Sequence, residues 1–356
     1  MTIENTAAQT HPVEQGDILF VGLDLGTSQS AVATSSGLRV NTASVIGWPK
    51  DLVSYKLHQK TILFGDECLR NRMSVDIYYP LERGVIAELV KGKKGEEDQR
   101  KLQAPTEFIR HVLSLAEPKE HQQVYLVAGS PAEATIQDKQ AVIDATSGLV
   151  NAVLVVSQPF LVAYGLGMYG FSLVVDIGAG TTDICRMHGT LPDEIDQKTL
   201  FKAGTFIDSL LFDLVQAKYP NANLTKQMAV QFKEKYAFVG QMSEQVSVEL
   251  IVDGKPARCD ITKEMKEACE SILPDIIATV RSLITSFDPD FQTDLRMNIV
   301  LAGCVSRMRG LPQVIEQGLA DLGQVSVKVV PDPVFAGAIG ALKLAQDMPL
   351  SEWQHL

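Results

Sequence analysis

Two segments of the chain combine a carboxylate, glycines and hydroxyl side chains in the same order. The first is Asp24-Leu25-Gly26-Thr27-Ser28, and the second, about 150 residues later, is Asp176-Ile177-Gly178-Ala179-Gly180-Thr181-Thr182-Asp183. Glycine allows backbone N–H groups to approach an anion closely, and hydroxyl groups add further donors. A carboxylate can hold hydrated Mg²⁺ against phosphate oxygens. These residues predict two turns that bind phosphate groups, which we call the first and second phosphate turns.

Each phosphate turn follows an apolar run that is typical of a buried strand, residues 18–23 before the first turn and residues 171–175 before the second. One such strand and turn would also fit an ordinary hairpin. Two copies, each followed by further strand-like sequence, favour two related lobes that hold one polyphosphate between them.

Length and composition restrict the class of protein. With 356 residues, of which 46% are hydrophobic and 21% charged, the chain is long enough for about two soluble globular domains. Its net charge of −11 argues against nucleic acid or an anionic membrane surface as the main partner. The five cysteines are scattered and form no CxxC pair, which indicates reduced, mostly buried thiols.

Two segments bear on the location of the protein. Residues 1–16 are polar and lack the order of charge and hydrophobicity of a signal peptide, so we expect a disordered arm in a cytoplasmic protein. Residues 148–175 carry no charge and are long enough to span a membrane, but Pro159 and several glycines interrupt them. We interpret them as a strand, a helix opened by Pro159 and a second strand, without membrane insertion.

Five other segments predict a hairpin, a buried strand, a loop and two helices. Residues 32–45 alternate loosely around Ser35-Ser36-Gly37, as in a hairpin, and residues 297–302 read as a buried strand. The mixed-charge run at 91–101 predicts a solvated loop. Residues 205–218 and 264–286 predict two long amphipathic helices, the second with Pro274 early in its course.

Four further segments extend the pattern of the phosphate turns. They are Phe64-Gly65-Asp66-Glu67, Tyr79-Pro80-Leu81-Glu82-Arg83-Gly84-Val85-Ile86, Lys233-Glu234-Lys235-Tyr236, and Leu301-Ala302-Gly303 with the following Ser306-Arg307-Met308-Arg309-Gly310-Leu311. Together with the two turns they resemble the actin superfamily, and within it the bacterial actins of magnetosomes, which are membrane-enclosed magnetic organelles. The resemblance covers nearly the whole chain after residue 17.

This resemblance implies an α/β, actin-like ATPase fold, in which two ribonuclease-H-like lobes with four subdomains surround a central nucleotide cleft. Lobe I would comprise residues 17–158 with a small insert at 46–83. Lobe II would comprise residues 159–330 with an insert at 204–273. A C-terminal helix within residues 331–356 would return to lobe I.

The resemblance also implies ATP and Mg²⁺ as cofactors. Asp24 would hold Mg²⁺ through water, and Asp176 would lie near the metal and help to place the attacking water. The implied cofactor-binding residues are Gly26, Thr27, Ser28, Gly178, Gly180, Thr181, Thr182, Lys233, Glu234 and Gly303. Glu234 would accept hydrogen bonds from the ribose and Lys233 would cover the base, whereas Asp183 could simply brace its turn.

Two positions depart from the family pattern. Gln158 stands where many bacterial actins have glutamate, and glutamine can orient a water molecule but cannot take its proton. Eukaryotic actins also have glutamine there, so we expect slow ATP hydrolysis with Gln158 as a catalytic residue. The second departure is Gly303-Cys304-Val305-Ser306, where the family has a glycine-rich loop; a valine forced to φ > 0 would cost about 1–3 kcal/mol.

The function implied by the resemblance is an ATP-dependent cytoskeletal protein that polymerises with itself into filaments and positions magnetosomes. Slow hydrolysis would control filament turnover, and adaptor proteins would link the filaments to the magnetosome vesicles. One alternative is an actin-like scaffold or copolymer subunit with little ATPase activity. Another is a small-molecule kinase of the same superfamily, although no segment between the phosphate turns resembles an acceptor site.

Overall fold

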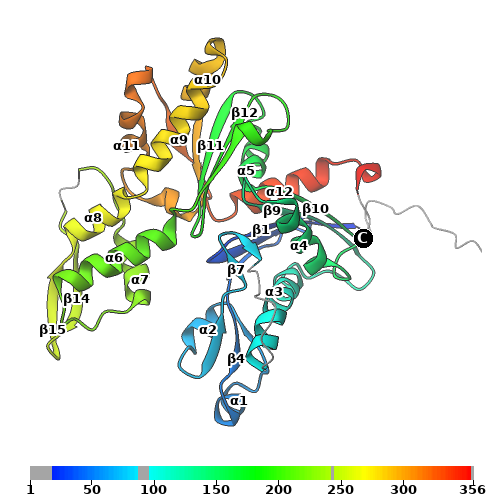
Figure 1. Ribbon diagram of the computed structural model, residues 1–356. Helices are drawn as coiled ribbons and strands as arrows, with labels where there is room; N and C mark the ends of the chain where they lie inside the picture. Colours follow the sequence, from blue (N-terminus) through cyan, green and yellow to red (C-terminus); the bar gives the residue numbers. More distant parts are fainter. Residues whose placement is uncertain (1–17, 87–95, 242–243, 354–356) are drawn as a thin grey trace, which may run out of the picture.

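Two five-stranded mixed sheets, each built from a different half of the chain, form the centre of the molecule (Figure 1). The computed structural model describes residues 18–86, 96–241 and 244–353. The first sheet, in the order β10-β9-β1-β2-β3, consists of β1 (Ile18–Leu25), β2 (Gln29–Thr34), β3 (Arg39–Ala43), β9 (Gln123–Ser130) and β10 (Ala152–Ser157). The second, in the order β13-β12-β11-β16-β17, consists of β11 (Ser172–Ile177), β12 (Thr182–Met187), β13 (Gln197–Leu200), β16 (Ile299–Ala302) and β17 (Val327–Val329).

The two sheets have the same topology. In each, three consecutive strands pair antiparallel, and two later strands add in parallel on the other side of the first one. Asp24 near the end of β1 lies opposite Gly129 of β9, and Asp176 near the end of β11 lies opposite Ala302 of β16. The two predicted carboxylates therefore occupy equivalent positions, at the ends of equivalent strands.

Two helices cross between the sheets, α5 (Gln158–Leu166) and α12 (Ala336–Asp347). Their buried side chains share one apolar core with strands of both sheets. The crossing is so close that a Cβ atom on Gly340 would overlap the carbonyl oxygen of Leu161. This helix pair is a main contact between the two halves of the molecule.

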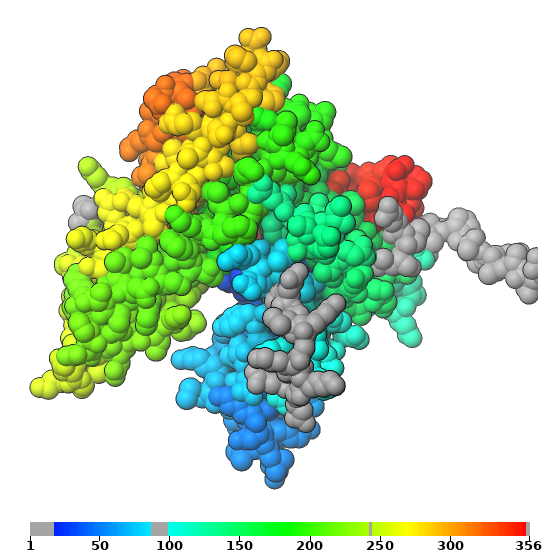
Figure 2. Space-filling model, viewed as in Figure 1, coloured from blue at the N-terminus to red at the C-terminus, as the bar shows by residue number. Residues whose placement is uncertain are grey.

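Smaller units extend outward from each sheet. The first comprises β4 (Ile46–Pro49), α1 (Leu52–His58), β5 (Leu63–Phe64), α2 (Asp66–Arg70) and β6 (Val75–Tyr78), followed by the hairpin of β7 (Leu81–Glu82) and β8 (Val85–Ile86). The second comprises α6 (Gly204–Lys218), α7 (Lys226–Tyr236), β14 (Ser247–Val252), β15 (Lys255–Asp260) and α8 (Thr262–Glu270). The space-filling view shows the molecule hollowed between these two units (Figure 2).

The remaining elements cover the outer faces of the sheets or connect their strands. The helices are α3 (Glu96–Ser114), α4 (Ile136–Thr146), α9 (Leu273–Thr285), α10 (Gln292–Met297) and α11 (Leu311–Gly318). The 3-10 turns are η2 (Glu194–Asp196), η3 (Pro289–Phe291), η4 (Cys304–Arg307), η5 (Ala320–Leu322) and η6 (Leu350–Glu352).

Most predicted elements are confirmed, including the hairpin of β2 and β3, the helix opened by Pro159 and the strand ending at Ala302. Two predictions are wrong. Residues 264–286 form two helices, because Pro274 fits the first turn of α9 and starts a new helix there. Residues 96–101 belong to α3 and are not a loop, while the rest of the 91–101 run lies outside the described residues.

Other sequence predictions concern location and cysteine chemistry. The arm predicted at residues 1–16 lies outside the described residues. Within the described ranges, no helix is both long and apolar enough to cross a membrane, and residues 148–175 form the predicted strand, helix and strand. All five cysteines are free thiols, and four of them are buried; Cys304 is exposed.

Candidate nucleotide site in the central cleft

A cleft of about 940 Å³ lies between the two halves, and both phosphate turns line it. The predicted site residues in its lining are Asp24, Gly26, Thr27, Ser28, Gln158, Asp176, Gly178, Gly180, Thr181, Lys233, Glu234 and Gly303. Segments that are far apart in the sequence thus meet around one cavity, whose volume is in the range of small-molecule and cofactor sites.

The two phosphate turns touch each other across the cleft. A Cβ atom on Gly180 would overlap the hydroxyl group of Thr27, so glycine is required for this approach. The same hydroxyl accepts a hydrogen bond from the backbone N–H of Gly84, at the tip of the β7–β8 hairpin, at 2.9 Å. The turns are therefore held at a distance at which one polyphosphate can contact both.

Asp24 and Asp176 lie close enough together for the charge of Asp24 to raise the pKa of Asp176. Burial raises the pKa of Asp24 to about 6; a hydrogen bond from Gln158 opposes this rise and the charge of Asp183 adds to it. Burial, and then the charges of Asp24 and Asp183, raise the pKa of Asp176 well above its usual value. Two carboxylates in such surroundings favour a bound cation, which would relieve their repulsion.

The carboxylates fit Mg²⁺ rather than a metal held by protein alone. Among residues 18–86, 96–241 and 244–353, no group of three or more His, Cys, Asp or Glu side chains could hold a metal ion. Mg²⁺ is commonly bound by one or two carboxylates together with substrate phosphates and water molecules. Asp24 and Asp176 supply the two carboxylates that such a site requires.

Gln158, the first residue of α5, is buried beside Asp24. Its Nε2 donates hydrogen bonds to Asp24 Oδ1 and to the carbonyl oxygen of Leu25, the latter at 3.3 Å. Gly129 leaves room for it, because a Cβ atom there would lie 2.7 Å from Gln158 Cγ. With Nε2 engaged, Oε1 remains as the acceptor that Gln158 can offer to a water molecule.

Two residues of the second turn brace it from outside the cleft. Asp183 is buried, and its Oδ1 accepts hydrogen bonds from the backbone N–H of Ala132 at 2.8 Å and from Thr199 Oγ1 at 2.6 Å. Thr182 was expected to bind the cofactor, but it is fully buried and its hydroxyl donates to the carbonyl oxygen of Lys202. The side chain of Thr182 thus stabilises the turn through Lys202, which follows β13, and Thr182 is absent from the lining of the cleft.

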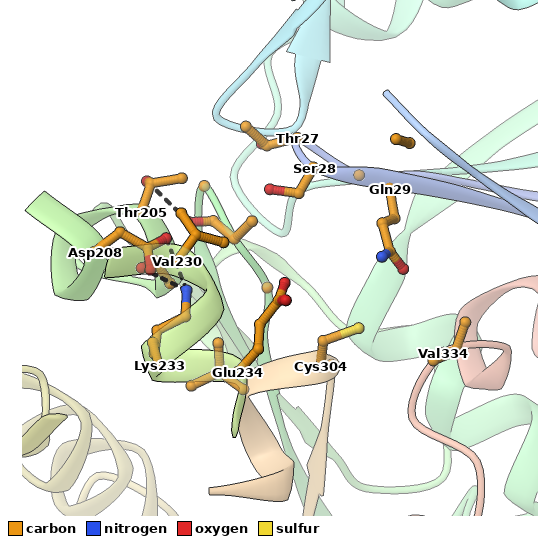
Figure 3. A pocket seen from close by; sticks show the side chains of 18 of the residues that line it. Thr27, Ser28, Gln29, Thr205, Asp208, Val230, Lys233, Glu234, Cys304 and Val334 are labelled. Atoms are coloured by element: carbon orange, nitrogen blue, oxygen red, sulfur yellow. Dashed lines mark hydrogen bonds and ion pairs between the residues drawn. The ribbon is translucent and has the colours of Figure 1, made fainter. Parts of the chain in front are cut away.

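Lys233 and Glu234 follow each other on α7, which lines the cleft, but their side chains take different positions (Figure 3). Lys233 Nζ donates to Asp208 Oδ2 at 2.7 Å and to the carbonyl oxygen of Gly204 at 3.0 Å. Glu234 extends into the open cleft, toward Cys304 (Figure 3). Asp208 is not predictable from the sequence as a partner of Lys233, because it lies on α6 and no local spacing connects the two residues.

The loop at residues 303–306 differs from what its sequence predicts. Gly303 has φ +75°, and a Cβ atom there would lie 2.5 Å from Asp176 Oδ1. Val305, however, has no positive φ; it lies in η4 and packs against the apolar core of the second half, which includes buried residues of β11 and β16. The expected strain at Val305 is therefore absent, because Gly303 alone adopts the left-handed conformation in this loop.

Two sheets of one topology around this cleft define an actin-like fold. The chain belongs to the MreB/Mbl protein family, whose sequence pattern matches residues 19–352.

Within this family, the chain is similar to proteins called MamK. Actin-like protein MamK of Paramagnetospirillum magneticum is 39% identical over 338 residues, which cover 95% of this chain and 95% of the relative. The solved MamK double helical filament has a TM-score of 0.88 and 40% identity, covering 93% of this chain and 99% of that chain. A non-polymerising MamK mutant bound to AMPPNP has a TM-score of 0.71 and 39% identity, with the same coverage.

Proposed function

We propose that this chain is a filament-forming ATPase, which binds ATP with Mg²⁺ between its phosphate turns and polymerises with itself. Slow hydrolysis then controls filament turnover. The observation that carries the proposal is the convergence of the two turns on one cleft, with Gly180 against Thr27. The 40% identity to a protein solved as a filament, and the AMPPNP in a related MamK structure, support it.

We also propose a cellular role for these filaments, supported by the similarity to MamK. The filaments lie in the cytoplasm alongside magnetosome vesicles, and adaptor proteins link the two. Residues 17–158 and 159–330 form the two lobes of each subunit, and the helix within 331–356 returns to the first.

The phosphate end of the site binds by charge and by hydrogen bonds. Asp24 and Asp176 would hold Mg²⁺ through its water molecules, and the ion would neutralise charge on the phosphate oxygens. The hydroxyl groups of Thr27 and Ser28 and the backbone N–H groups near Gly178 donate to the same oxygens. Binding therefore draws the two turns, and with them the two lobes, onto one ligand.

Gln158 orients the water that attacks the terminal phosphate. Its Nε2 is engaged by Asp24, so its Oε1 accepts a hydrogen bond from the water and fixes its direction. An amide cannot take the proton of the water, which is why hydrolysis is slow.

The nucleoside end is bound by the wall of α7. Glu234 accepts hydrogen bonds from the ribose hydroxyl groups. Asp208 and Gly204 hold the ammonium group of Lys233, so the aliphatic part of this side chain is fixed where it can cover the base.

Phosphate release and pelleting, measured on one preparation with MgATP, test this function. Wild-type protein should do both, and Asp176→Ala should slow phosphate release by roughly tenfold or more. Asp213→Ala, an exposed aspartate on α6, is the matched control and should behave as wild type. Unchanged release in Asp176→Ala would contradict the assignment of the site.

The second candidate is a filament subunit with little turnover, because Gln158 offers no carboxylate to the water. Pelleting with MgATP but without phosphate release would select this candidate. A rise in ADP only when a sugar or acid acceptor is added would instead indicate the kinase.

A further inference from the structure

Strand β13, at the edge of the second sheet, is fastened to the first half of the molecule. The connection that follows β9 contacts it. Glu133 Oε2 accepts a hydrogen bond from the backbone N–H of Thr199 at 2.9 Å, and the backbone N–H of Glu133 donates to Thr199 Oγ1 at 3.0 Å. Lys198 Nζ adds an ion pair with Glu133 Oε1 at 2.7 Å. These contacts join the two halves through backbone groups as well as side chains.

Asp183 connects this contact to the second phosphate turn. It is 2% exposed, and its Oδ1 accepts one hydrogen bond from each half, from the backbone N–H of Ala132 at 2.8 Å and from Thr199 Oγ1 at 2.6 Å. Asp183 lies opposite Asp176 on β11 and opposite Thr199 on β13. A buried carboxylate needs its donors, so separation of the halves would remove one that Asp183 requires. We call these residues the β13 bridge: Ala132, Glu133, Asp183, Lys198 and Thr199.

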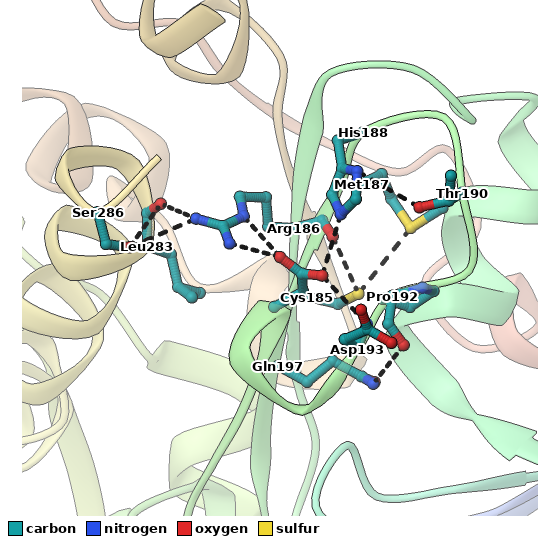
Figure 4. A network of polar contacts seen from close by, with 11 residues as sticks. Cys185, Arg186, Met187, His188, Thr190, Pro192, Asp193, Gln197, Leu283 and Ser286 are labelled. Carbon is teal, nitrogen blue, oxygen red and sulfur yellow. Dashed lines mark hydrogen bonds and ion pairs between the residues drawn. The ribbon is translucent and has the colours of Figure 1, made fainter. Parts of the chain in front are cut away.

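Strand β13 is in turn fixed to the rest of the second half. Directly before the strand, the buried Asp196 accepts a hydrogen bond from Arg186 Nε at 2.9 Å (Figure 4). Arg186 Nη1 also donates to the carbonyl oxygen of Leu283 on α9, at 2.7 Å. At the other end of the strand, the carbonyl oxygen of Lys202 accepts a hydrogen bond from Thr182 of the second turn. A displacement of β13 would therefore displace the second turn with it.

A second contact between the halves lies just after β13. The guanidinium group of Arg83, at the tip of the β7–β8 hairpin, lies over the ring of Phe201, 4.9 Å from the ring centroid. Arg83 has φ +52°, which a residue other than glycine rarely adopts and keeps only where its contacts hold it. A Cβ atom on Gly180 would lie 2.9 Å from Arg83 Cα, so the hairpin also lies against the second turn. The first half thus holds the same edge strand and turn at two places.

The angle between the halves matters for the proposed reaction, because each half supplies a different part of it. Gln158 directly follows β10 of the first sheet, and Asp24 lies on β1. Asp176 and the donors around Gly178 belong to the second half. The single crossing of α5 and α12 would allow rotation about it, and a displacement of about 1 Å between reacting groups can cost on the order of a hundredfold in rate. A further contact is needed to fix this angle.

We propose that Thr199 is a positioning residue for ATP hydrolysis, which acts through Asp183 and Glu133 to hold the second phosphate turn at its working distance from the first half. This inference rests on the proposed ATPase function and extends it to residues outside the site. No residue of the β13 bridge is in the lining of the cleft, so loss of the bridge changes geometry and leaves the contacts with the ligand in place. Turnover should therefore depend on the bridge more than nucleotide affinity does.

Thr199→Val tests the bridge with a side chain of nearly the same shape. It removes the hydroxyl group that bonds Asp183 and Glu133, so kcat for phosphate release should fall about tenfold while KM for MgATP stays within about twofold. Thr199→Ser keeps a hydroxyl group and should restore most of the rate. Thr279→Val is the matched control, because its hydroxyl group donates to the carbonyl oxygen of Asp275 in the same helix. The pelleted fraction is measured in the same samples, so that rates are compared at equal amounts of polymer.

Hydrogen exchange without nucleotide tests the bridge independently of activity. Peptides covering residues 131–133 and 178–181 should exchange roughly tenfold faster in Thr199→Val than in wild type, because the halves open more often. Glu133→Ala, at an exposed position, removes the acceptor that the first half offers to β13 and should give the same pattern and a lower kcat. The exposed Glu120→Ala is its control and should match wild type in both measurements.

Three results would overturn the proposal. One is a wild-type kcat in both Thr199→Val and Glu133→Ala. Another is faster exchange confined to residues 198–200, which would make Thr199 a local structural residue, and the third is a lost rate that Thr199→Ser does not restore. A wild-type protein that releases no phosphate from MgATP would overturn the ATPase function itself, and this result is visible before any variant is made.

Discussion

At the scale of single residues, the centre of the site is a pair of carboxylates with one amide beside them. Asp24 and Asp176 lie one residue before the ends of equivalent strands of the two sheets, and Gln158 donates a hydrogen bond to Asp24. The pKa values of both carboxyl groups are raised, chiefly by burial. Without a cation the charges of these carboxyl groups oppose each other, so the residues that we propose to bind MgATP reduce the stability of the empty protein.

Replacing Gln158 tests the proposed water position. Gln158→Ala should lower phosphate release by about five- to a hundredfold, because a hydrogen bond of about 1–3 kcal/mol is lost in the transition state. Nucleotide affinity, measured by titration with a fluorescent analogue, should remain nearly unchanged. The exposed Gln137→Ala is the control, and release at the wild-type rate in Gln158→Ala would contradict the role.

Replacing Asp24 tests how the carboxyl group of the empty site changes the free energy of unfolding with pH. A carboxyl group whose pKa rises on folding, here from 3.8 to about 6, stabilises the fold below pH 3.8 and loses this contribution as pH rises through 6. Without metal or nucleotide, Asp24→Asn should therefore be more stable than wild type by up to about 3 kcal/mol near pH 8. Near pH 4 the difference in urea unfolding should disappear, and a difference independent of pH would contradict the shifted pKa.

The phosphate turns are predictable from the sequence, whereas the side-chain pairs around them are not. The order of aspartate, glycine and hydroxyl residues is local, so it can be read along the chain. The pairs Gln158–Asp24 and Lys233–Asp208 join distant segments, and they appear only once the sheets and helices are assembled. The strain expected at Val305 is absent for a related reason. The conformation of that loop is decided by its packing against the core, which also joins distant segments.

At the scale of elements, the crossing of α5 and α12 holds the two halves together. Glycines at 165 and 340 face each other there, and a Cβ atom on Gly165 would lie 2.9 Å from Gly340 Cα. The close approach places the apolar faces of both helices against both sheets in one core. Any motion between the halves must therefore preserve or pivot about this contact.

Gly340→Ala tests the closeness of this crossing. The added methyl group would overlap the carbonyl oxygen of Leu161, so α5 and α12 must separate, at a cost of about 1–3 kcal/mol or more in the free energy of unfolding. Gly170→Ala is the control, because a Cβ atom there meets nothing within 4 Å. Equal urea midpoints for the two variants would show that the helices do not pack as described.

The sequence predicts a strand or a helix correctly where one apolar spacing extends over a single element and stops at its end. The run at 264–286 keeps its apolar spacing through residues 271 and 272, so periodicity alone could not separate α8 from α9. Pro274 carried the missing signal, since proline in a first turn begins a helix more often than it interrupts one. The charged residues at the start of α3 were predicted to form a loop. Their helix is stabilised by the apolar residues that follow them, so the charged run alone does not reveal it.

At the scale of the whole molecule, two sheets of one topology surround one cleft, and the chain belongs to a family with filament-forming members. The chain superposes on the MamK filament with a TM-score of 0.88 and on the AMPPNP-bound, non-polymerising mutant with 0.71. The cleft in which we propose that nucleotide binds lies between the two halves of the molecule. A ligand that contacts both phosphate turns can therefore change the angle between the halves.

The most direct test of a filament-forming ATPase is one time course in which light scattering and phosphate release are followed together after MgATP is added. We expect scattering to rise first and phosphate to follow, because in the proposed function ATP binding forms the filaments and hydrolysis controls their turnover. Removal of Mg²⁺ with EDTA should suppress both signals. Flat scattering at every protein concentration, or phosphate release that is equally fast below the critical concentration, would contradict a polymerisation-coupled ATPase.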